Sequence, residues 1–147
     1  MIRNIIRFTF LLILLVSCKF EFGQENHLVT KPEMMAVCNK FMAVFRNKKY
    51  TEALQGLKPY SYIEPFKIDT LVATVSQQMS AFTKENGEML SYEIVSEKDV
   101  KDSLIKLTYL AKFKRWYIRF VFILYNNGGG WAITKFDYDQ HIDELFQ

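Results

Sequence analysis

The sequence predicts an α+β fold in which N-terminal helices pack on a curved, four-stranded antiparallel sheet. Apolar residues recur at helical spacing before Gly87 and alternate with polar residues after it. Three helical segments come first and four strand-like segments with short polar turns follow, an order typical of an antiparallel meander. Hydrophobic residues make up 50% of the 147, and aromatic residues 16%, which is enough for one buried core.

The first residues have the order of a secretory signal. A basic segment, residues 1–7, precedes an apolar run over residues 8–16, and a cysteine, Cys18, follows at once. The apolar run is much shorter than the about 20 residues that a membrane-spanning helix needs. Export is therefore the expected reason for this segment.

The end of the signal resembles the lipobox of bacterial lipoproteins. An aliphatic residue, Leu15, stands three positions before Cys18, and a small residue, Ser17, stands directly before it. The resemblance implies that residues 1–17 are removed and that Cys18 is acylated, so that two or three fatty chains hold the protein on a membrane of the cell envelope. The alternative is cleavage near Gly23 or Gln24 and release as a secreted or periplasmic soluble protein.

Residues 18–29 are expected to form a tether, and residues 30–147 a single α+β domain. The tether has mixed charge and no sustained periodicity. Lipidation of Cys18 leaves Cys38 without a partner for a disulfide; if Cys18 stayed free, a bridge between the two becomes available. Without Arg3 and Arg7, 17 basic residues face 16 acidic ones, which gives no electrostatic reason to expect binding to nucleic acid.

The first helix is expected to begin after Thr30, which forms a capping box with Glu33 while Pro32 occupies the first turn. Its apolar stripe contains Met34, Val37, Cys38, Phe41, Met42, Val44 and Phe45.

A break at residues 47–49 separates this helix from a shorter second one that ends before Pro59. Asp69 is the expected N-cap of a third helix, which stops at Asn86 and Gly87.

Four strands are expected after Gly87, because β-branched and aromatic residues alternate there with polar ones. They cover residues 89–97, 103–112, 117–125 and 131–138. The clearest turn is residues 126–130, Asn-Asn-Gly-Gly-Gly, whose members tolerate a positive φ.

This order of elements, over residues 30–138, resembles the cystatin-like superfamily and within it the nuclear transport factor two-like group. Two local patterns support the likeness: residues 50–53, Tyr-Thr-Glu-Ala, and residues 130–133, Gly-Trp-Ala-Ile, followed by Phe-Asp-Tyr at 136–138. The resemblance implies a cone whose mouth holds a ligand. The candidate pocket residues on the strands are Tyr92, Lys106, Tyr109, Arg119 and Asp137, although each could instead lie on a solvated face.

Isomerases and dehydratases of that superfamily place a carboxylate or histidine base beside a tyrosine or acid. In this chain only Asp137 with Tyr109 or Tyr92 offers such a pair, and the catalytic residues are otherwise unknown.

Other kinds of site have no basis in the sequence. The triple glycine lacks the Lys-Ser/Thr of a phosphate loop, and no Cys/His cluster has metal-ligand spacing, so no metal or cofactor is expected. Cys38 lies on the apolar helix face, where a buried inert thiol is expected. The basic residues Lys112, Lys114, Arg115 and Arg119 are interpreted as the solvated rim of a hairpin, with contact to anionic headgroups or an acidic partner as the alternative. The Gln-x-Val-x-Gly hairpin of cystatin inhibitors is missing.

The leading hypothesis is a non-catalytic envelope lipoprotein that binds a small apolar ligand or a protein partner. The alternative is a small enzyme of the isomerase or dehydratase type, with a pocket carboxylate and a tyrosine. A homodimer through the open sheet face is a third expectation. An interior filled by large apolar side chains favours binding, whereas a closed pocket holding Asp137 near a tyrosine favours the enzyme.

Overall fold

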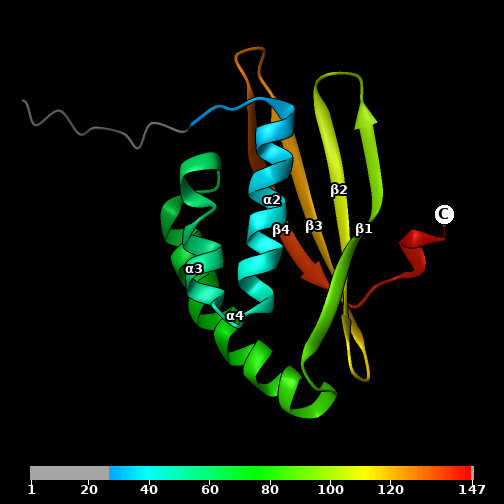
Figure 1. The fold of residues 1–147 in the computed structure, drawn as a ribbon. Helices are drawn as coiled ribbons and strands as arrows, with labels where there is room; N and C mark the ends of the chain where they lie inside the picture. The colour runs from blue at the N-terminus through cyan, green and yellow to red at the C-terminus, as the bar shows by residue number, and fades with distance from the viewer. Residues whose placement is uncertain (1–26, 147) are drawn as a thin grey trace, which may run out of the picture.

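Residues 27–146 are described by a computed structural model, which confirms the predicted α+β class (Figure 1). The predicted signal peptide, residues 1–17, and Cys18 lie outside these residues. The helices are α2 (Lys31–Arg46), α3 (Tyr50–Gln55) and α4 (Pro65–Asn86), with short 3₁₀ turns η1 (Lys58–Tyr60) and η2 (Asp143–Leu145). The strands are β1 (Met89–Val100), β2 (Leu104–Phe113), β3 (Tyr117–Asn126) and β4 (Trp131–Asp139).

Helix α2 begins where the capping box predicts. The backbone N–H of Thr30 donates to Glu33 Oε2 at 2.8 Å, and the backbone N–H of Glu33 donates to Thr30 Oγ1 at 3.5 Å. Two otherwise unpaired donors of the first turn are thus satisfied. The buried face of α2 is the predicted stripe, with Met34, Cys38, Phe41, Met42 and Phe45 at its centre.

Helix α4 begins one turn earlier than predicted, and the assignment of Asp69 as its N-cap was wrong. Pro65 occupies the start of the helix, where its fixed φ favours the first turn. Asp69 lies inside the helix, and its Oδ1 accepts hydrogen bonds from Gln55 Nε2 at 2.7 Å and Lys58 Nζ at 2.6 Å. The carboxylate therefore joins α4 to α3 and η1 instead of capping a backbone.

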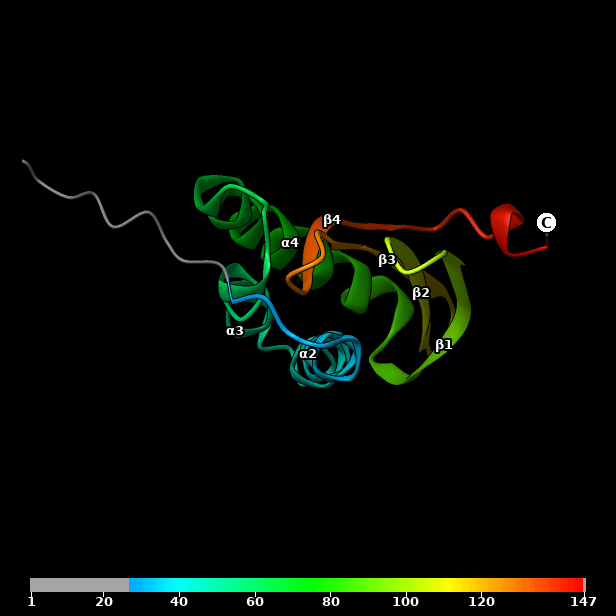
Figure 2. The ribbon, with the colours of Figure 1, turned by 90° about the horizontal axis from the view of Figure 1, so that it is seen from above.

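The four strands form an open antiparallel sheet in the order β1-β2-β3-β4. Register shifts interrupt the β1–β2 pair twice and the β3–β4 pair once. Such bulges increase local twist and bend the sheet. Figure 2 shows the helices on the concave side of the sheet and the C-terminal segment on its convex side.

The concave side is filled by a cluster of aromatic rings. Phe41 of α2 packs against Phe122 at 5.4 Å and Phe136 at 5.0 Å between ring centroids, and against Phe45 and Phe120 as well. All five side chains are buried. Each buried ring contributes roughly 1.5–3 kcal/mol, so this cluster is the main force that holds α2 on the sheet.

Residues 27–29, the last three of the predicted tether, lie against the fold. The backbone N–H of His27 donates to the carbonyl of Pro59 at 2.6 Å, and Val29 forms an isolated antiparallel bridge with Trp131. The remaining tether residues precede the described part of the chain. Among the helices of residues 27–146, none combines the length and the apolar character needed to cross a bilayer.

Gly87, at the junction of α4 and β1, has a φ of +82°, and a Cβ at this position would lie 2.7 Å from Lys114 Cβ. We expect Gly87→Ala to lower the free energy of unfolding by about 2 kcal/mol, because both the backbone conformation and the contact become unfavourable. Urea denaturation measures the change. Gly129→Ala is the matched control, since Gly129 lies in a turn without a positive φ; equal losses in the two variants would contradict this explanation.

Candidate functional site

Tyr109 is the predicted pocket residue that lies deepest on the concave side of the sheet. Its side chain is 1% exposed, and its hydroxyl donates to Asn39 Oδ1 of α2 at 2.7 Å. Burial raises the pKa of this phenol above its ordinary value. Tyr109 is therefore a neutral donor that fixes β2 to α2.

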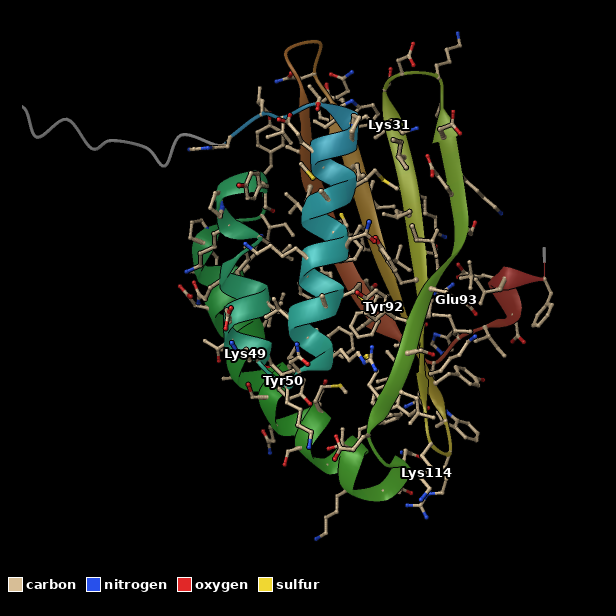
Figure 3. All side chains as sticks on the ribbon, viewed as in Figure 1. Lys31, Lys49, Tyr50, Tyr92, Glu93 and Lys114 are labelled. Carbon is tan, nitrogen blue, oxygen red and sulfur yellow. The ribbon has the colours of Figure 1, made fainter. Side chains whose placement is uncertain are left out.

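Tyr92 lies on the same side. It stands opposite Ala111 in the register of β1 and β2, and its ring makes an edge contact with Tyr109 at 6.3 Å. Figure 3 shows Tyr92 on the side of β1 that faces α2, with Glu93 directed to the opposite side. The structure thus brings Tyr92 and Tyr109 together.

Asp137 lies on the convex side, away from both tyrosines. It is exposed, stands opposite Val121 and has Lys135 Nζ at 3.6 Å from its Oδ2. Its neighbours in β4, Phe136 and Tyr138, pack on the concave side. The predicted pairing of Asp137 with a tyrosine is not assembled, because the sheet separates the two groups.

Arg119 is a buried guanidinium on the convex side, with a side chain only 5% exposed. Its Nε and Nη2 donate to Asp139 Oδ1 and Oδ2 at 3.0 and 2.7 Å, in a two-pronged ion pair. Its Nη1 donates to Glu144 Oε2 at 2.8 Å. Lys106, from β2, donates to the same oxygen at 3.1 Å. We call Lys106, Arg119, Asp139 and Glu144 the convex ion cluster.

The pKa values of Arg119, Asp139 and Glu144 shift toward the charged forms. The hydrogen bonds with Asp139 raise the pKa of Arg119. Bonds from Arg119 and then from Lys106 lower the pKa of Glu144 to about 2. Burial alone raises the pKa of Asp139, but hydrogen bonds from Arg119 and from the backbone N–H of His141 outweigh it, so the net pKa is lowered. Arg119, Asp139 and Glu144 therefore stay ionised at neutral pH.

The hairpin rim is smaller than predicted, because Arg119 belongs to the convex ion cluster instead. Arg115 is also held: its backbone N–H donates to the carbonyl of Asn86 at 3.0 Å, and its guanidinium bonds the carbonyl of Glu85. The remaining basic residues of this group, Lys112 and Lys114, are exposed.

A hollow of about 710 Å³ lies between the first half of α4 and β4. Its most exposed apolar members are Phe66, at 62%, and Tyr62, at 41%, and we call it the Tyr62–Phe66 hollow. Ile63, Leu71 and Phe136 extend its apolar lining, and its polar lining is Glu64, Lys67, Thr70, Thr134 and Lys135. Neighbouring exposed aromatic rings are typical of binding surfaces.

A second hollow, of about 640 Å³, lies between the second half of α4 and the ends of β3 and β4. Met79, Phe82, Ile118 and Tyr138 are among its lining, beside polar residues that include Asp139 and His141. None of the five predicted pocket residues lines either hollow. Sequence reasoning missed both, because each joins a helix to a strand far along the chain.

Metal-ligating side chains are not gathered within residues 27–146. No set of three or more His, Cys, Asp or Glu side chains there could hold a metal ion. Cys38 is buried as predicted, and burial raises the pKa of its thiol to about 12, which leaves no reactive thiolate at neutral pH.

Asp139→Asn is expected to lower the free energy of unfolding by about 2–4 kcal/mol, because it leaves the buried Arg119 with an incomplete set of acceptors. Asp137→Asn is the matched control on the same strand and face, and should change stability by less than about 0.5 kcal/mol. Thermal and urea unfolding of both variants measure the difference. If the two variants lost similar amounts of unfolding free energy, the convex ion cluster would not stabilise the fold.

The geometry therefore offers two open apolar hollows beside α4, a filled interior, and a charged cluster on the opposite side of the sheet. Open apolar surface of this kind can bury apolar groups of another molecule. Comparisons of the chain with protein-family models, with curated proteins and with solved structures found no match.

Proposed function

We propose that the chain is a cell-envelope lipoprotein, anchored through Cys18, whose folded body is a non-catalytic module that binds a small apolar ligand. The observation that carries the binding function is the Tyr62–Phe66 hollow, where two exposed aromatic rings lie beside the apolar side chains of Ile63, Leu71 and Phe136. Its volume lies within the about 300–1,000 Å³ typical of small-molecule sites.

The filled interior supports this choice of site. In a cone-shaped fold a ligand enters between the helices and the sheet, but here Phe41, Phe122 and Phe136 occupy that space. A ligand is then accommodated where α4 and β4 diverge. The isomerase or dehydratase alternative gains no support, since Asp137 and Tyr109 lie on opposite sides of the sheet.

The anchoring part of the proposal rests on the lipobox-like residues before Cys18. The hydrogen bond from His27 to Pro59 marks the point where the chain joins the folded body, and residues 19–26 separate it from Cys18. Eight extended residues reach about 26–29 Å. The body can therefore stand clear of the lipid headgroups while it is tethered.

The homodimer through the convex face stays a proposal, for which exposed Val100, Leu104 and Tyr125 offer apolar area.

Phe66→Ala is expected to weaken binding of the neutral apolar fluorophore N-phenyl-1-naphthylamine by about fivefold or more, because a ring buried by a ligand contributes about 1 kcal/mol or more. A polypeptide from Glu25 onward is suitable, since the buried core lies entirely between Met34 and Phe136. Fluorescence titration gives the dissociation constants.

The matched control for this experiment is Trp116→Ala. Trp116 is an aromatic residue of similar exposure, 49%, in the turn between β2 and β3. Its removal should leave probe binding unchanged. Absence of saturable binding to the unaltered chain would contradict the binding function, and saturable binding insensitive to Phe66→Ala would contradict the choice of hollow.

Cys18→Ser is expected to move the full chain from the membrane fraction to the soluble or unprocessed fraction of a bacterial host, because the acyl chains are lost. Cell fractionation with intact-mass analysis measures both location and acylation. Cys38→Ser is the control, as the buried Cys38 is not expected to receive lipid. A mature chain that begins downstream of Cys18 and carries no acyl group would overturn the anchor.

A further inference from the structure

Two cations on the convex face converge on one oxygen atom. Lys106 Nζ and Arg119 Nη1 lie 3.1 and 2.8 Å from Glu144 Oε2. In the register of β2 and β3, the pair Thr108 and Val121 lies between these two residues, and both members are buried although they point to the convex side. Lys106 and Arg119 therefore form the two ends of a small cradle with a buried floor, and Glu144 occupies it.

Arg119 is prepared for an external acceptor by its other contacts. Arg119 Nε and Nη2 donate hydrogen bonds to Asp139, which fixes the plane of the guanidinium. The third nitrogen, Nη1, is thereby directed at the cradle. Asp139 also balances only one of the two positive charges. Without the Glu144 carboxylate the cradle holds Lys106 and Arg119 against Asp139 alone, so one positive charge lacks an anion.

Glu144 lies near the C-terminal end of the described residues. It lies in the three-residue turn η2, whose backbone hydrogen bonds, Leu145 N–H to Ile142 O and Phe146 N–H to Asp143 O, are local. A turn of this kind has little stability of its own. Figures 1 and 2 show the segment on the outside of the sheet, away from the helices. Glu144 is thus a carboxylate ligand on a segment that can leave.

We propose that the convex face carries a carboxylate-binding site, formed by Lys106 and Arg119, in which Glu144 is an internal ligand that an external carboxylate can replace. The external group is either a free dicarboxylate or an acidic side chain of a peptide, because both present the same oxygen pair. The site lies on the opposite side of the sheet from the concave core, and it does not depend on the apolar ligand proposed above.

The test compares the full chain, purified from bacterial membranes in a nonionic detergent, with its Glu144→Gln variant at physiological salt. Calorimetric titration uses two probes, succinate and a peptide of residues 140–147, in which Glu144 is in trans. If Glu144 fills the cradle nine-tenths of the time, its removal should tighten binding of an external carboxylate about tenfold. Combining Lys106→Ala with Glu144→Gln should reverse this gain.

Glu88→Gln is the matched control, because Glu88 is an exposed glutamate paired with a single cation, Lys48, and its substitution changes the net charge equally. Tighter binding in Glu144→Gln but not in Glu88→Gln supports the site. If Glu144→Gln binds succinate more tightly, the external ligand is a free dicarboxylate. If it binds only the peptide more tightly, the ligand is an acidic segment.

The proposal is overturned if Glu144→Gln, with an unchanged circular dichroism spectrum, binds neither probe more tightly than the original chain. An equal gain in Glu88→Gln would overturn it as well, because general charge would then explain the effect. Binding of N-phenyl-1-naphthylamine is measured on the same variants and is expected to be unchanged, which keeps the outcome separate from that of the apolar site.

Discussion

The packing of Phe41 between α2 and the concave face of the sheet constrains most of what this fold can do. Its ring touches those of Phe45, Phe120, Phe122 and Phe136. Interiors of proteins are packed at nearly crystalline density, so rings in this position leave no room for a ligand. The space between α2 and the sheet is thereby filled, and the Tyr62–Phe66 hollow and the second hollow lie to its side, along α4.

The two sides of the sheet consequently have different chemistry. On the concave side polar groups serve the packing: the Tyr109 hydroxyl is satisfied by Asn39, and Cys38 stays protonated. On the convex side the buried guanidinium of Arg119 is stabilised by two carboxylates. A buried charge needs such partners, because removal from water is costly. One of those partners, Asp139, is fixed in a strand, and the other is carried by a short turn.

Local features of the chain were the most predictable from the sequence. The capping box of Thr30, the apolar stripe of α2 and the glycine-rich turn before Trp131 each depend on neighbours within a few residues. The N-cap assignment failed at Asp69, because its carboxylate pairs with Gln55 and Lys58 of another segment. The predicted ends of the four strands lie within three residues of the observed ends, because the alternation of apolar and polar residues persists up to each turn.

By itself the sequence determined the class of fold, the order of the α-helices and strands between residues 27 and 146, and the buried thiol. Only the tertiary structure decided which side chains meet. Strand β3 is apolar on both faces between Phe120 and Leu124, so its pattern does not indicate which face meets the helices. The packing of α2 decides this, and with it the separation of Asp137 from Tyr109 and the burial of Arg119. The hollows beside α4 have the same origin, because they join residues that are distant in the chain and adjacent only after folding.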